Sequence, residues 1–130
     1  MRINMYGVSA LLGGILSAVF LKKAERNVYK FALQHPSLSP AEASSLHINI
    51  GLSYAKQQKY KQATEYFDRV FHEQIQQGFV YDSSFTKVIQ AYLKSNQKER
   101  AKQVLSIMLC NRGKDTRYKK LEKKFSFLLN

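Results

Sequence analysis

The chain has almost no cysteine, which limits how its fold can be held together. Cys110 is the single cysteine among 130 residues, so no internal disulfide can form. We therefore expect the protein to work in a reducing compartment. Cys110 follows Met108 and Leu109, and we expect it on the apolar face of a helix as a buried, unreactive thiol.

Motifs for catalysis and for metal or cofactor binding are also missing from the sequence. The three histidines are scattered, and His72-Glu73 lacks the second histidine that a zinc-protease helix needs. There is no glycine-rich phosphate loop and no nucleophile elbow around a serine. The sequence therefore predicts a protein that is not an enzyme and that has no cofactor and no metal site.

Negative charge is scarce as well. Nine Asp and Glu residues stand against 21 Lys and Arg residues, which gives a net charge of +12. A balance of this sign favours an acidic protein, an anionic membrane surface or nucleic acid as a partner. The length of 130 residues allows one domain, and a hydrophobic content of 45% suffices for a helical core.

Residues 5–21 contain no charged side chain and lie within the longest uncharged run of the chain, which Ile3 and Asn4 extend. The run is near the lower length limit for a helix that spans a bilayer, so we predict an amino-terminal membrane anchor. A cleaved signal peptide and a buried first helix of a soluble protein are the alternatives. The signal peptide fits poorly, because Leu16 and Leu21 stand where a cleavage site needs small residues.

The two sides of this run carry unequal positive charge. Arg2 precedes it, whereas four cations follow it directly: Lys22, Lys23, Arg26 and Lys30. By the positive-inside rule, the part that follows faces the cytoplasm, in a single-pass protein of a bacterial plasma membrane or the mitochondrial outer membrane. We expect the four cations to meet anionic lipid headgroups.

Small residues form two stripes along the uncharged run. Each stripe has the i, i+4 spacing that permits close helix contact in lipid: Ser9, Gly13 and Ser17, and Ala10, Gly14 and Ala18. They predict contact with a second membrane helix, either from a partner or from a second copy of this chain. The alternative is that small residues are simply tolerated in a membrane helix.

A helix start and a helix-pair pattern follow the run. Ser39-Pro40-Ala41-Glu42 offers a capping hydroxyl, a proline at the first helical position and a carboxylate three residues after the cap. Downstream, small and apolar residues recur at helical spacing: Ile50, Gly51, Tyr54, Tyr60, Ala63, Phe67 and Val70. This stretch resembles one tetratricopeptide repeat (TPR), which implies two closely packed helices in an α-α superhelix that binds other proteins.

The pattern recurs in a second unit, with Val88, Ile89 and Tyr92 followed by Ala101, Leu105 and Met108. Its longer period predicts an extended turn at residues 76–79. Upstream, three apolar residues before Pro36 resemble the second helix of an incomplete repeat: Ala24, Val28 and Phe31.

The second unit departs from the TPR pattern in two ways. Ile89 replaces the small residue at the position of Gly51, and Ser95-Asn96 supplies no turn glycine. The unit instead resembles the pentatricopeptide family, which implies RNA binding. The resemblance is carried by Phe85, Val88, Ile89, Tyr92 and Lys94, together with Ala101, Met108 and Arg112-Gly113. Two units would read almost no sequence, however, because each repeat of that family reads one base.

A second basic cluster lies near the carboxy terminus and contains Arg112, Lys114, Arg117, Lys119, Lys120, Lys123 and Lys124. Apolar residues recur through it at helical spacing, at Tyr118, Leu121, Phe125 and Leu128. We therefore expect an amphipathic helix whose apolar stripe closes the last repeat and whose outer face is basic. That face is either simply solvated or a surface for an acidic protein, a membrane or nucleic acid.

The predicted architecture is all-α. Residues 1–23 form the anchor helix, residues 24–37 a helical connector or partial repeat, and residues 38–130 a TPR-like domain. That domain has about two helix pairs in an α-α superhelix and a basic capping helix.

The TPR resemblance implies an adaptor or scaffold that holds a protein partner on the first helices of its pairs. It points to six groove residues: Asn49, Leu52, Lys56, Lys87, Gln90 and Lys94. The three lysines among them favour an acidic peptide. The alternatives are an accessory structural subunit of a larger membrane complex and a small RNA-binding helical-repeat protein.

Overall fold

The computed structural model describes the backbone of residues 5–72 and 80–130, and the side chains of residues 17–72 and 80–130. Its elements in these ranges are α1 (Met5–Ala32), α2 (Pro40–Lys56), α3 (Tyr60–Asp68), α4 (Phe85–Lys94), α5 (Lys98–Cys110), α6 (Tyr118–Lys124) and the 3-10 helix η1 (Ser126–Leu128). The predicted all-α class is confirmed. The extended turn predicted at residues 76–79 lies outside the described residues.

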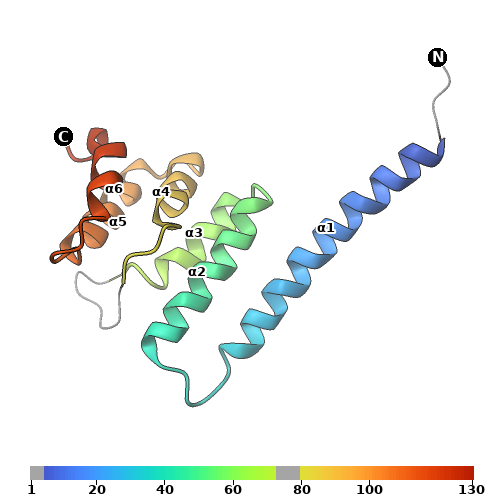
Figure 1. Ribbon diagram of the computed structural model, residues 1–130, viewed down its shortest axis with the longest axis horizontal. Coiled ribbons are helices and arrows are strands. Elements are labelled where there is room, and N and C mark those ends of the chain that lie inside the picture. The colour runs from blue at the N-terminus through green and yellow to red at the C-terminus, as the bar shows by residue number, and fades with distance from the viewer. Residues whose placement is uncertain (1–4, 73–79) are drawn as a thin grey trace.

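The amino-terminal part of helix α1 forms an arm that extends away from the other helices, whereas its carboxy-terminal part lies against α2 (Figure 1). The helix runs without a break across residue 23, the predicted boundary between anchor and connector. Among the side chains that the structure describes, no helix combines the length and the apolar character needed to cross a membrane. Most of the predicted anchor, residues 5–21, lies outside those side chains.

The two predicted small-residue stripes are therefore described only at their carboxy-terminal ends. Ser17 and Ala18 are exposed on α1. The side chains of the other four lie outside the described set: Ser9, Ala10, Gly13 and Gly14.

Helix α2 begins with the predicted capping box. Ser39 has an extended backbone, with φ −74° and ψ 158°, and its Oγ accepts a hydrogen bond from the Glu42 backbone N–H at 3.2 Å. In return, the Ser39 backbone N–H donates to Glu42 Oε1 at 3.3 Å. Pro40 follows the cap, where its missing N–H leaves no helical hydrogen bond unmade.

Two helical hairpins, α2–α3 and α4–α5, share one turn geometry. The chain enters the left-handed region at Gln58 in the first turn, with φ 62°, and at Asn96 in the second, with φ 61°. The next backbone N–H then closes each turn, from Lys59 to the Tyr54 carbonyl at 3.0 Å and from Gln97 to the Tyr92 carbonyl at 2.9 Å. The expected turn glycine is thus not required, because a single left-handed residue suffices.

The core joins both hairpins, and the helices of the first hairpin pack closely at Gly51. A Cβ on Gly51 would lie 2.4 Å from Cε1 of Phe67, whose side chain is fully buried. The absence of a side chain therefore lets α2 and α3 approach closely. At the equivalent place in the second hairpin, Ile89 and Leu105 are both fully buried.

The carboxy-terminal segment closes the core as predicted. Four side chains from α6, its end and η1 are buried, namely Tyr118, Leu121, Phe125 and Leu128. The α-helix is shorter than the apolar stripe, since it ends at Lys124 and η1 continues the chain.

One expectation about burial is wrong. Cys110 is exposed at the end of α5, and not buried. On α1, Val28 and Phe31 are 66% and 77% exposed, whereas the buried side chain is Arg26, at 6%. The part of α1 that packs on α2 therefore presents a cation, and its apolar stripe faces outward.

Candidate partner-binding groove

The six predicted groove residues lie on α2 and α4, the first helices of the two hairpins, which contact each other. The uncharged members are half-buried: Asn49, Leu52 and Gln90. The lysines are exposed: Lys56, Lys87 and Lys94. Leu52 packs partly against the core, so much of its surface already serves the fold.

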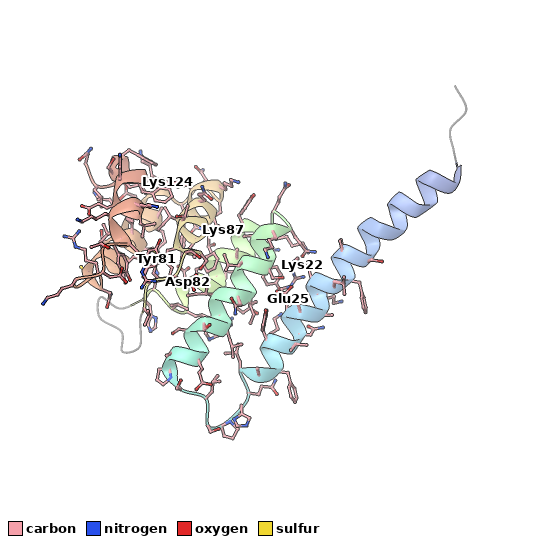
Figure 2. The ribbon with its side chains drawn as sticks, viewed as in Figure 1. Lys22, Glu25, Tyr81, Asp82, Lys87 and Lys124 are labelled. Carbon is pink, nitrogen blue, oxygen red and sulfur yellow. The ribbon has the colours of Figure 1, made fainter. Side chains whose placement is uncertain are left out.

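A cleft of about 290 Å³ lies between α2 and the segment that leads into α4. Ile48 and Asn49 line its α2 side, and Phe85 lies on the other side with Tyr81 and Asp82, which are labelled in Figure 2. The cleft combines apolar surface with an amide and a carboxylate. It therefore suits an apolar anchor with hydrogen-bonding groups, while Asp82 opposes an acidic group at this end.

Lys56 and Lys94 are the last residues of α2 and α4 and lie beside the hairpin turns. The Lys94 Nζ donates to the Tyr60 hydroxyl at 3.3 Å and lies 5.2 Å from the centroid of its ring. Seven residues of helix, about 10 Å, separate Lys56 from Asn49. An extended partner would thus meet the cleft at one end of the groove and positive charge at the other.

A stack of cations and tyrosines, not foreseen from the sequence, joins α1 to the first hairpin. The Tyr54 and Tyr66 rings stack with centroids 5.7 Å apart. The guanidinium of Arg26 lies 4.1 Å from the Tyr54 centroid, and that of Arg69 lies 4.3 Å from the Tyr66 centroid. Lys30 Nζ lies 5.7 Å from both rings. The tyrosine faces thus attract three cations to one place.

Hydrogen bonds fix Arg26 within this stack. Its Nη1 donates to Ser53 Oγ at 3.1 Å and to Gln57 Oε1 at 2.8 Å. Burial lowers the pKa of Lys30, but hydrogen bonds to Tyr54 and Tyr66 outweigh it, and the pKa is raised overall. The expectation that Arg26 meets lipid headgroups is therefore wrong, because tertiary packing turns it towards α2.

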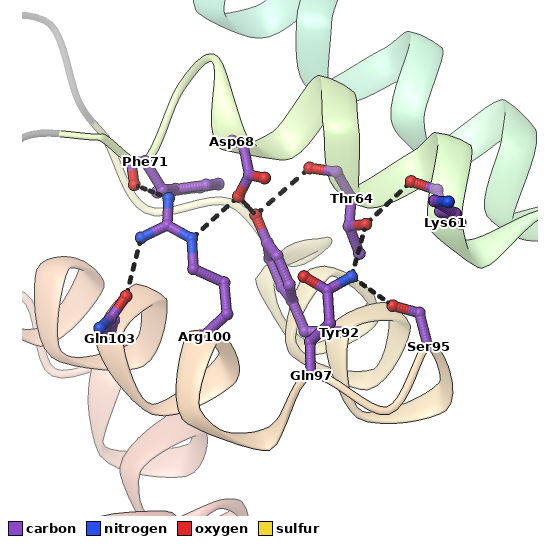
Figure 3. Close-up of polar contacts among 9 residues, drawn as sticks. All are labelled: Lys61, Thr64, Asp68, Phe71, Tyr92, Ser95, Gln97, Arg100 and Gln103. Atoms are coloured by element: carbon purple, nitrogen blue, oxygen red, sulfur yellow. Dashed lines mark hydrogen bonds and ion pairs between the residues drawn. The ribbon is translucent and has the colours of Figure 1, made fainter.

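The two hairpins interlock through a polar network centred on Asp68 (Figure 3). The Tyr92 hydroxyl donates to Asp68 Oδ1 at 2.7 Å, and Arg100 Nε donates to the same oxygen at 2.9 Å. Arg100 Nη2 also donates to the Phe71 carbonyl at 2.6 Å. Burial, followed by the hydrogen bond to Asp68 and its charge, raises the pKa of Tyr92. This network holds α3, α4 and α5 in register.

The basic carboxy-terminal surface is only partly neutralised. Arg112 pairs with Glu122 at 2.9 Å, and Arg117 pairs with Asp115 at 2.6 Å. The hydrogen bonds from Arg117 lower the pKa of Asp115. In the described part of the chain, no ion pair is formed by the other five members, Lys114, Lys119, Lys120, Lys123 and Lys124, and all are exposed.

The cleft and the exposed lysines offer surfaces for binding. Within residues 17–72 and 80–130, no group of three or more His, Cys, Asp or Glu side chains lies close enough together to hold a metal ion. Comparison with known proteins adds no family: no protein-family model matches the chain, and no curated protein or solved structure matches it either.

Proposed function

We propose that this protein is a membrane-tethered adaptor or scaffold that binds a protein partner across α2 and α4. This proposal is supported chiefly by the cleft between Asn49 on α2 and the segment that leads into α4. Three exposed lysines lie on these two helices. Residues 5–21 would anchor the chain in the membrane, and the helices that follow would face the cytoplasm.

The charge of the groove favours an acidic peptide as partner. Lys56, Lys87 and Lys94 are exposed on the two helices, while Asp82 lies at the cleft end. A partner segment with an apolar anchor for the cleft and acidic residues beyond it would match this distribution. We propose that the bound segment places its apolar anchor in the cleft and its acidic residues beside the lysines.

A pull-down from detergent-solubilised membranes with the tagged full chain tests this proposal. The variant with Lys56, Lys87 and Lys94 changed to alanine should lose most of the captured protein. A control with Lys119, Lys120, Lys123 and Lys124 changed to alanine should lose little, although it removes more charge. The reverse ranking would assign binding to the carboxy-terminal surface and contradict the groove proposal.

The dependence of binding on salt concentration distinguishes nucleic acid from a protein partner. Binding of RNA through these lysines should fall steeply with ionic strength, because each neutralised phosphate releases counterions. We expect only weak binding of a generic single strand, lost near physiological salt. Tight, sequence-selective RNA binding there would contradict the adaptor proposal.

An accessory subunit of a larger membrane complex is the second candidate. It is favoured by the outward face of α1, where Val28 and Phe31 are 66% and 77% exposed. Exposed apolar side chains three residues apart share one face of a helix, and such a face is typical of a surface that another helix covers. A photo-cross-linker at Val28 should then join the chain to one subunit in stoichiometric yield. A product made of two copies of this chain would instead indicate a homodimer.

A further inference from the structure

The carboxy-terminal end of α2 lies beside the part of α1 where the uncharged residues 5–21 end. The two helices run in opposite directions (Figure 1). Ser53 Oγ donates to the Lys22 carbonyl at 3.5 Å, and Gln57 Oε1 accepts from Arg26 at 2.8 Å. Each residue beyond Ser53 advances about 1.5 Å along α2, towards the amino-terminal half of α1. The α2–α3 turn at Gln58 therefore lies beside the end of residues 5–21.

The second hairpin turn lies against the first. Gln97 Nε2 donates to Thr64 Oγ1 at 3.0 Å, and Lys94 Nζ donates to the Tyr60 hydroxyl at 3.3 Å. A shallow hollow is lined by both turns, including Lys59, Lys61 and Lys94. We refer to residues 57–62 and 95–98 together as the turn surface; Lys56 and Lys94 border it and belong to the proposed partner groove.

The turn surface is positive, whereas the amino-terminal ends of α2 and α4 and the segments that lead into them are not. The two ranges of the turn surface contain no Asp or Glu, and their three lysines are all exposed, namely Lys59, Lys61 and Lys98. Residues 34–42 and 80–85, at the opposite ends of α2 and α4, contain Glu42 and Asp82 but no Lys or Arg. The charge therefore changes along the length of these helices.

From this geometry we infer that the turn surface binds anionic lipid headgroups and holds the helical module against the membrane. The inference rests on the proposed anchor, since residues 5–21 in the bilayer would bring both turns to the headgroup level. Anionic lipids attract lysines within about a Debye length of the surface. Lys59, Lys61 and Lys98 thus take the role that the charge pattern predicted for Arg26, whose side chain is buried.

The docked orientation also places the groove. Helix α2 has 17 residues, so its capped start lies about 25 Å further from the bilayer than its end at Lys56. With α2 along the membrane normal, the cleft at Asn49 then lies about 10 Å further from the headgroups than Lys56 does.

Spin labels on the full chain test the inference. In a Cys110→Ser background, one variant carries Gln58→Cys in the turn surface and another carries Ser37→Cys at the far end of the module. The chains are reconstituted into phosphatidylcholine vesicles with or without phosphatidylglycerol, each containing a nickel-chelating lipid. The Gln58 label should relax faster than the Ser37 label, and phosphatidylglycerol should widen the difference.

Matched charge variants identify the lysines responsible. Changing Lys59, Lys61 and Lys98 to glutamine should abolish the effect of phosphatidylglycerol. Changing Lys119, Lys120 and Lys123 to glutamine removes the same charge and should leave the effect in place. Equal relaxation of both labels, or an effect insensitive to the turn-surface lysines, would overturn the inference.

A carbonate wash of the same vesicles separates the two proposals. A chain that the wash releases has no anchor, so the proposed function fails together with this inference. A chain that stays in the vesicles, but whose Gln58 label lies no nearer the surface than its Ser37 label, keeps the anchor and overturns only the headgroup contact.

Discussion

Gly51 shows at the scale of one residue how the first hairpin is specified. Its missing side chain leaves room for the ring of Phe67, and three ring atoms would lie within 2.9 Å of an added Cβ. Phe67 is fully buried among core residues, so its ring has little space into which it can move.

Gly51→Ala should therefore destabilise the protein by about 1–3 kcal/mol through overpacking, measured by urea unfolding of the full chain in mild detergent. The penalty should shrink in a Phe67→Leu background, because the smaller side chain makes room for the methyl group. An equal penalty in both backgrounds would contradict the packing described for Gly51.

Two buried tyrosines should respond differently to loss of the hydroxyl. The Tyr92 hydroxyl donates to Asp68, whereas the buried Tyr118 hydroxyl has no hydrogen-bond partner in the described part of the chain. Tyr92→Phe should lower the free energy of unfolding by about 1–3 kcal/mol, and Tyr118→Phe should be neutral or stabilising. Similar losses in both variants would argue against the Asp68 network.

The same hydroxyl of Tyr118 predicts a response to alkaline pH. Burial raises its pKa from 10.0 to about 12. Ionisation of Tyr118 therefore has no effect on the free energy of unfolding below about pH 10 and lowers it as the pH rises to about 12, because the unfolded chain ionises first. Tyr118→Phe should make the fall in unfolding free energy over this range shallower, as followed by circular dichroism.

At the scale of the helix, α1 differs most from what the sequence predicts. Neighbouring charges near an uncharged run suggested that Arg26 meets lipid, but the contacts that bury it come from Ser53, Tyr54 and Gln57 on another helix. Contacts of this kind depend on how α1 crosses α2, which no local pattern encodes.

Arg26→Ala should therefore loosen α1 from α2. Amide hydrogen exchange in residues 22–32 should become about tenfold faster or more, since two hydrogen bonds from a charged donor are lost. Lys23→Ala removes the same charge from an exposed position and should leave exchange unchanged. Equal exchange in the two variants would mean that the stack does not hold α1.

Local signals predicted their elements well, and the misses have physical causes. The capping box at Ser39 needs only neighbouring residues, so the sequence was sufficient to place the start of α2. Cys110 was predicted to be buried from its apolar neighbours. Two positions after the buried Met108, however, a helix has turned by about 200°, and this carries Cys110 to the exposed side.

The same contrast applies to the groove. The helix-pair pattern placed its six residues on α2 and α4, where the structure has them. The cleft also needs Tyr81 and Asp82, which precede α4 and carry no repeat signal. Only the tertiary arrangement brings them opposite Asn49.

The whole molecule has an arm, a groove and two basic surfaces. The amino-terminal part of helix α1 extends away from the hairpins, and the carboxy terminus lies at the other end of the molecule (Figure 1). With the arm anchored, the turn surface would face the membrane and the basic surface around α6 would remain further away. This arrangement suits a tethered module that presents one groove to a cytoplasmic partner.

Photo-cross-linking in intact membranes tests this account most directly. A cross-linker at Asn49, in the cleft, is compared with one at Gln103, which is exposed on α5. We predict a discrete protein adduct from Asn49 but not from Gln103, and the adduct should stay in the membrane pellet after a carbonate wash. No adduct from Asn49 beyond that from Gln103, or an adduct released by the wash, would contradict a membrane-tethered partner-binding module.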